Sequence, residues 1–464
     1  MPLPTIPSGN VNSGLATGFD VANSVRYNDD DSPKLNINFG SDGVLNKWTF
    51  SMWFKRSTLG TAQRLFCVID SGMDDYIKFG TDDQIEWGFD HEDSNRGILK
   101  TNRVFRDVSA WYHLVCRLDT TDSTAGDRMR MYINGTEETS FATDTNPPLN
   151  ETGDIGRDNN HYIGTSGSSQ YFDGYIAEVC MINNQSLAPT SFGEYDEDSP
   201  TIWKPKNVSG LTAGTNGFYL DFEDSGNLGN DAFGGTDWTE TNLAATDQST
   251  DTCTNNFCTM NSLVNSYSTN VTFSEGNLKC THPGVWGGVP GTMGVQNGRW
   301  YWEVKVTTGN SANAFTGIVA EDVNFLDSTV YDETGLLLYF VDGRKTVDGS
   351  DSEGFFDSLA TNDIVGVHLD LDSGTKQVTF TKNGSTSGSA VNLTSNHTSK
   401  FVLPVSIGNS SSATANWEFN FGSPHYSITS GNADDNGYGN FEYPPNISTT
   451  KYYALCTKNL AEYG

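Results

Sequence analysis

Short runs in which every second residue is large and apolar recur along this chain, and turn-forming segments separate them. Residues 47–56 (KWTFSMWFKR) and 299–306 (RWYWEVKV) are two such runs. Side chains alternate between the faces of a strand, so Trp300, Trp302 and the following valines would share one face. We interpret that face as the wall of a core and not as a ligand platform. With 48 glycines and many Asn, Asp, Ser and Thr residues between the runs, the pattern predicts an all-β chain of short strands and tight turns.

The length of 464 residues exceeds what one compact core usually holds, so at least two domains are expected. Aromatic residues make up 12% of the chain, which provides the apolar burial needed for folding despite the polar composition. The seven cysteines are scattered and odd in number, so most are expected to be reduced thiols. For Cys253 and Cys258, in CTNNFC, a disulfide and half of a metal site both remain open.

The chain is strongly acidic, with 27 Lys and Arg against 58 Asp and Glu and a net charge of −31. This charge disfavours nucleic acid as a partner and is typical of a soluble protein displayed at high density. Calcium binding by the cluster YNDDDS at residues 27–32 is a weaker alternative, because the cluster lacks the spacing of a calcium loop. We expect no other cofactor. The sequence shows neither a secretion signal nor a run of about 18 apolar residues, so membrane insertion is not expected.

The first half of the chain carries motifs of a known family. SVRYNDDDSPKL, WYHLV, RMYING and YFDGYIAEVCMINNQSL occur in one order between residues 24 and 197. This segment resembles the laminin-G-like, concanavalin A-like jelly roll. The resemblance implies a two-sheet antiparallel sandwich from a family whose members mostly bind glycans or proteins, with a minority of glycosidases.

The last third carries a second set of motifs. THPGVWGG, GRWYWEVKV, VGVHLDLDSGTKQVTFTKNG and a closing Asn-Phe-Gly at residues 420–422 follow one another within residues 285–425. This segment resembles the SPRY (B30.2) domain, which is also a concanavalin A-like sandwich. The predicted fold is therefore all-β, with two concanavalin A-like antiparallel β-sandwiches (jelly rolls) joined by an irregular connector.

The remaining segments are predicted to be an N-terminal arm at residues 1–23, the connector at residues 198–284 and a C-terminal tail at residues 426–464. GTNGFYLDF and NLAATDQSTDTCTNNFCTMN in the connector are similar to a segment that recurs in virion proteins of marine tailed bacteriophages, and the tail is similar to their endings. This resemblance implies a virion location, assembly in the host cytoplasm and other virion subunits as partners. A homo-oligomer is expected, with a trimer as one form.

Ligand contacts are expected in loops, because the inner faces of a sandwich are used for packing and its end loops are free to vary. An aromatic ring beside carboxylates or small polar groups suits a sugar. The residues that meet this description are Trp286, Tyr331, Asp332, Asp351, Phe355 and Phe356 in the last third, and Tyr162 and Tyr171 in the first half.

Catalytic motifs are not evident in the sequence. EYDEDS at residues 194–199 is the closest approach to the paired carboxylates of glucanases on this fold, but it ends in Ser and is expected in a loop. We therefore expect no catalytic residue and no enzyme. The favoured function is a tail fibre or spike component that binds host-surface glycan or protein. The alternatives are a capsid or tail decoration protein that binds only virion subunits, and a polysaccharide-degrading enzyme.

Overall fold

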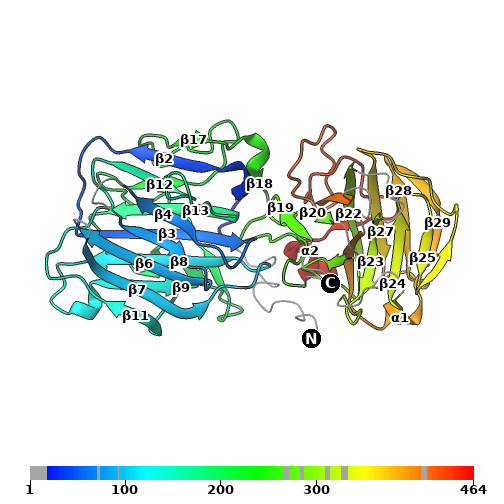
Figure 1. Ribbon diagram of the computed structural model, residues 1–464, viewed down its shortest axis with the longest axis horizontal. Coiled ribbons are helices and arrows are strands. Elements are labelled where there is room, and N and C mark those ends of the chain that lie inside the picture. Colours follow the sequence, from blue (N-terminus) through cyan, green and yellow to red (C-terminus); the bar gives the residue numbers. More distant parts are fainter. Residues whose placement is uncertain are drawn as a thin grey trace. The chain divides into compact units, whose positions relative to one another are not determined.

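The computed structural model describes residues 18–69, 74–91, 94–264, 271–282, 287–308, 314–325, 333–408 and 415–464. The chain divides into two compact units, with the boundary between Thr254 and Asn255. Each unit is built from antiparallel β-sheets, shown in Figure 1. The predicted all-β class with antiparallel sandwiches is confirmed. No helix among the described residues is long and apolar enough to cross a membrane.

The first unit has two large sheets. One runs in the order β10 (Thr136–Glu137), β9 (Met129–Ile133), β8 (Tyr112–Asp119), β3 (Lys47–Arg56), β13 (Gly174–Asn183), β1 (Ser24–Tyr27) and β18 (Gln248–Ser249), and β16 (Phe218–Leu220) also pairs with β13. The other runs in the order β11 (Phe141–Thr145), β7 (Ser94–Val104), β6 (Gln84–His91), β5 (Tyr76–Phe79), β4 (Gln63–Val68), β12 (Asn160–Ile163), β2 (Lys34–Asn38) and β17 (Thr239–Thr241). A small hairpin joins β14 (Gly193–Tyr195) to β15 (Trp203–Pro205), and the short 3₁₀ helices are Asp29–Asp31, Ala125–Asp127, Pro189–Ser191 and Ala245–Asp247.

The second unit also has two sheets. One runs in the order β19 (Thr272–Ser274), β20 (Lys279–His282), β31 (Ala415–Asn420), β22 (Arg299–Thr308), β27 (Ile364–Asp370), β28 (Gln377–Lys382) and β29 (Ser385–Asn392), and β32 (Tyr453–Ala454) joins β22 in parallel. The other runs in the order β21 (Gly287–Pro290), β30 (Val402–Gly408), β23 (Ala314–Ala320), β24 (Leu336–Phe340), β25 (Lys345–Val347) and β26 (Ser350–Ser352). Two short helices complete this unit, α1 (Ser395–Thr398) and α2 (Thr457–Tyr463).

The alternating runs form the cores. Trp48, Phe50, Met52 and Phe54 of β3 are fully buried in the core of the first unit. Trp300 and Trp302 of β22, with the valines that share their face, are buried in the core of the second. The prediction that the aromatic strand at residues 299–306 is a core wall is confirmed, because alternation places its large side chains between the two sheets.

The predicted connector at residues 198–284 is not an irregular linker in this structure. Its first part belongs to the first unit, where β16, β17 and β18 pair with β13, β2 and β1. It also contributes core side chains, namely Phe218, Leu220, Phe222, Leu228 and Trp238. Its last part belongs to the second unit, where β20 pairs with β31. Strands of two to four residues leave no visible alternation, and their partners lie far away in the sequence, so the local pattern could not reveal them.

The predicted arm and tail are also parts of the two units. Within the described part of the arm, Val21 is buried and exchanges hydrogen bonds with Thr254 through its backbone N–H and C=O. The tail covers the outer face of β22, where Phe441 packs edge-to-face on Tyr301. The Glu303 carboxylate accepts hydrogen bonds from the backbone N–H groups of Glu442 and Tyr443 at 3.0 and 2.7 Å. A segment that satisfies a buried carboxylate in this way is part of the domain.

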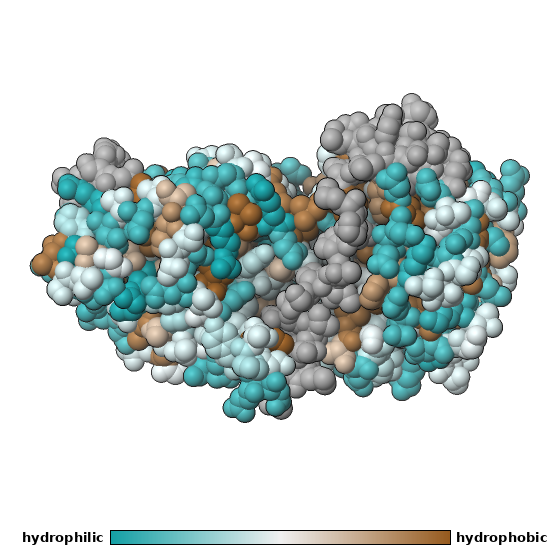
Figure 2. All heavy atoms as spheres, turned by 90° about the horizontal axis from the view of Figure 1, so that it is seen from below, coloured by the Kyte–Doolittle hydropathy of each residue, from teal (hydrophilic) through white to brown (hydrophobic). Residues whose placement is uncertain are grey.

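The described surface is mostly polar. In the view of Figure 2 hydrophilic residues dominate, and hydrophobic residues form small separate spots. The large apolar side chains that are exposed lie far apart in the sequence and are Val104, Leu149, Tyr195 and Leu263. Recognition on the face shown would therefore depend on polar groups and single aromatic rings more than on a broad apolar patch.

All seven cysteines lie among the described residues as buried thiols, and none of them is in a disulfide bond. Burial raises the pKa of Cys67, Cys116 and Cys180, which makes these thiols unreactive. We expect reductant to leave the melting temperature unchanged, because each sandwich has a large core that needs no covalent link. Thermal melting with and without dithiothreitol checks this, and a fall of more than about 5 °C in reductant would reveal a stabilising disulfide.

A β-bulge in β13 holds a buried carboxyl group. The register of β13 on β3 shifts between Ala177 and Cys180, and Glu178 within this bulge has a φ of 51°. The Tyr219 hydroxyl donates a hydrogen bond to the Glu178 carboxyl at 2.7 Å. Burial raises the pKa of Glu178 from 4.5 to about 8, although the Tyr219 hydrogen bond opposes this shift. Glu178 is therefore largely protonated at neutral pH.

The raised pKa of the Glu178 carboxyl should make the stability of the first unit depend on pH. The folded state holds the Glu178 proton more tightly than the unfolded chain, so the free energy of unfolding of the first unit should fall as pH rises from 4.5 to about 8. Glu178→Gln should remove this part of the dependence and be more stable than wild type at pH 8 by on the order of 3 kcal/mol. Urea unfolding of both proteins at pH 5 and pH 8 measures this, and equal pH slopes would contradict it.

Candidate functional site

Three of the predicted contact residues, Trp286, Tyr331 and Asp332, lie outside the described residues. Tyr162 and Tyr171 lie in the first unit, and both are half-buried. Tyr162 belongs to β12, and the Lys34 ammonium lies 5.7 Å from the centre of its ring. Both tyrosines remain predictions as ligand contacts.

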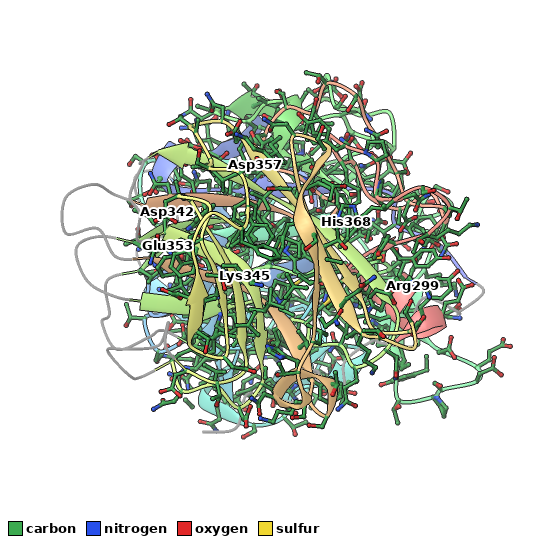
Figure 3. All side chains as sticks on the ribbon, turned by 90° about the vertical axis from the view of Figure 1, so that its right-hand side faces the viewer. Arg299, Asp342, Lys345, Glu353, Asp357 and His368 are labelled. Atoms are coloured by element: carbon green, nitrogen blue, oxygen red, sulfur yellow. The ribbon has the colours of Figure 1, made fainter. Side chains whose placement is uncertain are left out.

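The predicted contacts at residues 351–356 differ in their exposure. Asp351 is exposed on the edge strand β26, 3.4 Å from the Arg344 guanidinium. Phe355 is half-buried, with the Lys345 ammonium 3.6 Å from the centre of its ring. Figure 3 shows Lys345 with Asp342 and Glu353 nearby, away from Arg299. This charged edge remains a candidate contact surface.

Phe356 is different, because the prediction that it is a ligand contact is wrong in this structure. Its side chain is only 6% exposed and packs on Tyr339 and Phe380, with ring centres 4.4 and 5.2 Å apart. The turn-rich sequence around it shows no alternation, so the sequence could not indicate that one of two adjacent phenylalanines enters the core while the other stays near the surface.

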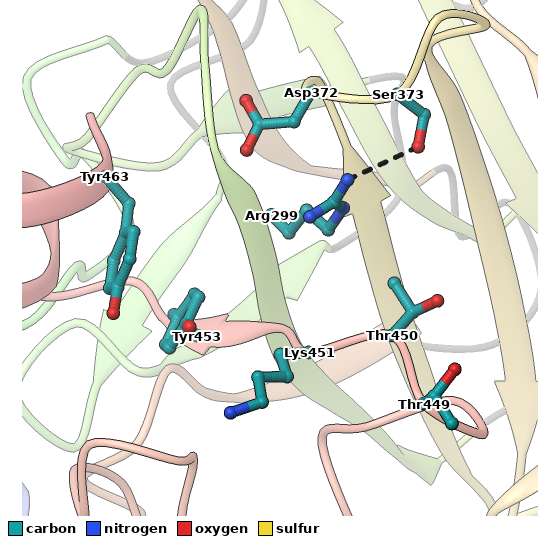
Figure 4. Close-up of a pocket in the computed structure, with 8 residues that line it drawn as sticks. All are labelled: Arg299, Asp372, Ser373, Thr449, Thr450, Lys451, Tyr453 and Tyr463. Atoms are coloured by element: carbon teal, nitrogen blue, oxygen red, sulfur yellow. Dashed lines mark hydrogen bonds between the residues drawn. The ribbon is translucent and has the colours of Figure 1, made fainter.

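A pocket of about 450 Å³ lies in the second unit, between the beginning of β22, the turn from β27 to β28 and the C-terminal tail. Figure 4 shows its lining, which consists of Arg299, Asp372, Ser373, Thr449, Thr450, Lys451, Tyr453 and Tyr463. Its volume is within the range of small-molecule sites, and its lining combines two aromatic rings with six polar or charged side chains. We take it as the candidate ligand-binding site.

The strand side of this pocket is fixed by the carboxylate of Asp370, the last residue of β27. Asp370 accepts hydrogen bonds from the backbone N–H groups of Asp372 and Ser373 and from the Ser373 hydroxyl. Its carboxylate also lies 3.1 Å from Nε of Arg299. Burial alone would raise the pKa of Asp370, but these hydrogen bonds and the guanidinium hold that pKa below its ordinary value. Arg299 and Ser373 are therefore held in place before any ligand arrives.

The tail side is fixed by aromatic stacking and by a second buried carboxylate. The rings of Tyr453 and Tyr463 are stacked, with centres 3.9 Å apart and planes inclined by 13°. Tyr453 is positioned by the pairing of β32 with β22. The Asp434 carboxylate accepts hydrogen bonds from the Ala454 N–H and the Asn459 amide, which ties β32 to α2. The two tyrosines thus form a rigid aromatic wall.

Two buried serine–histidine pairs elsewhere do not have the arrangement of a catalytic dyad. Nε2 of His113 lies 2.8 Å from the Ser51 hydroxyl, and Nδ1 accepts a hydrogen bond from Nε1 of Trp203 at 2.9 Å. Nδ1 is therefore the unprotonated nitrogen and Nε2 carries the proton, so His113 cannot take a proton from Ser51 through Nε2. Burial lowers the pKa of His113 to about 3.

The second such pair is His282 with Ser406, also at 2.8 Å. Both residues are fully buried, and burial lowers the pKa of His282 to about 3. A substrate cannot reach this serine without opening the core. For the part of the chain that the structure describes, no group of three or more His, Cys, Asp or Glu residues is arranged to hold a metal ion. The predictions of no enzyme and of a weak calcium site stay predictions.

The domain identity of each unit follows from comparison with known proteins. Residues 29–189 match the concanavalin A-like lectin/glucanases superfamily, and residues 299–424 match the SPRY domain. The chain carries a concanavalin A-like domain and a SPRY domain. No curated protein is significantly similar to the chain in sequence.

Solved structures that are similar to the chain include the SPRY domain of human HERC1, with 17% identity, 34% of this chain and 96% of that chain covered, and a TM-score of 0.28. A heptameric SAP-like pentraxin from Limulus polyphemus has 15% identity, with 37% and 80% covered and a TM-score of 0.28. A proposed carbohydrate-binding protein from Bacteroides ovatus has 13% identity, with 48% and 59% covered and a TM-score of 0.33.

Sequence reasoning did not identify the pocket of the SPRY domain. Its residues come from three segments separated by up to 164 positions between Arg299 and Tyr463. The Asp-rich turn DLDSGT and the aromatic residues of the tail are visible in the sequence, but nothing in it indicates that the tail returns to the beginning of β22. The signal that could have pointed to the site is the presence of two tyrosines, Tyr453 and Tyr463, in a polar tail.

Proposed function

We propose that this protein is a non-enzymatic surface component of a tailed-bacteriophage virion, a tail fibre or spike subunit that binds glycan or protein on the host surface. The two domain families indicate a carbohydrate- or protein-binding role. The observation that supports a binding function most directly is the pre-arranged pocket of the SPRY domain, in which a rigid tyrosine wall faces charged and hydroxyl groups. The net charge of −31 suits a protein displayed at high density.

The virion location is supported by the resemblance of residues 198–284 and of the tail to virion proteins of marine tailed phages. In the structure these segments are not linkers, because they belong to the two units and contribute buried side chains to them. A decoration protein that binds only virion subunits is the alternative, and it would use the same two domains.

Two measurements test the proposal. Gold-labelled antibodies against the purified protein should decorate the tail of particles that contain it, and the purified protein should bind host cells and inhibit infection. Labelling confined to the capsid, without cell binding, would favour the decoration protein. Release of reducing sugars from host polysaccharide would overturn the non-enzymatic assignment.

A further inference from the structure

The cations in the pocket of the SPRY domain are already neutralised by carboxylates of the protein. Nε of Arg299 lies 3.1 Å from Asp370, and Nζ of Lys451 lies 2.5 Å from Asp435. Asp372 adds a further, exposed carboxylate, which accepts a hydrogen bond from the Gly298 N–H at 2.8 Å. An anionic ligand would have to displace one of these carboxylates and approach a chain with a net charge of −31. The pocket therefore disfavours anions.

The hydrogen-bonding groups that line the pocket are suited to hydroxyls. Thr449 and Thr450 carry hydroxyls that both donate and accept, the Arg299 guanidinium only donates, and the Asp372 carboxylate only accepts. A ligand that carries donors and acceptors on the same group can satisfy all of them without bringing a charge into the pocket. Polyols have this property, whereas an apolar ligand would leave the remaining hydrogen-bonding capacity of these groups unused.

The aromatic wall adds a second requirement. Tyr453 and Tyr463 line the pocket as a stacked pair in which each ring covers one face of the other, so a ligand can meet an outer ring face and the ring edges at a fixed orientation. A sugar ring presents an apolar face of C–H groups to such a surface and directs its hydroxyls sideways to polar partners. The volume of about 450 Å³ is sufficient for a small ligand of this kind.

We infer that this pocket binds an uncharged saccharide, in which a sugar ring lies against the tyrosines and hydroxyls bind Asp372, Arg299 and Thr450. The inference rests on the proposed function, because it names the ligand class of the same site. It assigns glycan recognition to the SPRY domain of this chain, and it makes the C-terminal tail part of the binding site.

The test uses the full-length protein on an array of neutral, uronate, sulfated and amino glycans, followed by calorimetric titration with the glycans that are retained. We expect neutral glycans to be preferred. Thr450→Trp should fill the pocket, and Tyr463→Ala should remove half of the aromatic wall, so each should weaken binding by about tenfold or more. Tyr195→Ala, which removes a 42% exposed tyrosine of the concanavalin A-like domain, is the matched control and should leave affinity unchanged.

Thr450 and Tyr463 are half-buried, so melting curves are needed to show that a loss of binding is not a loss of folding. Preference for uronate, sulfated or amino glycans would overturn the inference, as would full affinity of Thr450→Trp or the absence of any retained neutral glycan. Host-cell binding separates the two proposals. If Thr450→Trp binds cells as wild type does, the pocket inference fails while the attachment function stands, whereas failure of wild type to bind cells contradicts attachment.

Discussion

Replacing Asp251 with alanine is expected to destabilise the concanavalin A-like domain by about 3 to 5 kcal/mol. The Asp251 carboxylate lies 2.8 Å from Nζ of Lys55, and both side chains are at most 2% exposed. Its other oxygen accepts a hydrogen bond from Nε1 of Trp111 at 3.0 Å. Removal of the carboxylate would break this buried ion pair and the Trp111 hydrogen bond together, which costs more than the loss of an exposed ion pair. Urea unfolding of the full-length protein measures the change.

A matched pair of variants shows whether buried charge is the cause. Lys55→Met combined with Asp251→Asn keeps an acceptor for Trp111 and removes both charges, so it should recover most of the lost stability. Glu137→Ala breaks an exposed ion pair with Arg130 and should cost no more than about 1 kcal/mol. If Asp251→Ala were as mild as Glu137→Ala, residues 249–254 would not be packed into the domain, and the predicted connector would regain support.

The second large effect is expected at Trp302 in the SPRY domain. Trp302→Ala should cost about 3 to 5 kcal/mol, because its fully buried side chain would leave a cavity between the two sheets. Among the described residues Nε1 of Trp302 has no hydrogen-bond partner, so the loss is one of packing. Differential scanning calorimetry of the full-length protein should show a lower transition for this domain and an unchanged one for the other.

Trp302→Phe is the matched control, since it keeps an aromatic ring in the same position and loses no hydrogen bond. Its effect should be clearly smaller than that of the alanine variant. Glycan binding by Trp302→Phe should equal wild type, because this side chain faces the core and does not line the pocket. A loss of binding without a loss of stability would mean that the aromatic strand contributes to the site after all.

The sequence alone predicted those parts of the fold that depend on residues close together in the chain, namely alternating strands and tight turns. Alternation in residues 47–56 and 299–306 was sufficient to place the large side chains of β3 and β22 in two cores. The turn Asn134-Gly135 and the turn Asn383-Gly384 have the positive φ angles that tight hairpins require. The all-β class follows from such local patterns, whereas the two sandwiches were expected from the resemblance of residues 24–197 and 285–425 to known domain families.

Tertiary structure decided where the domains end and which residues form the site. The strands β16, β17 and β18 are too short to show a period, and only pairing with β13, β2 and β1 fixes them. Phe355 and Phe356 are adjacent and chemically identical, yet one stays near the surface and the other fills the core. The pocket exists because Glu303 and the pairing of β32 with β22 hold the tail on the sheet, while Asp434 ties β32 to α2. These contacts bring Tyr453 and Tyr463 to Arg299. Contacts between residues this far apart in the sequence form only when the whole domain has folded. No periodic pattern in the local sequence indicates them.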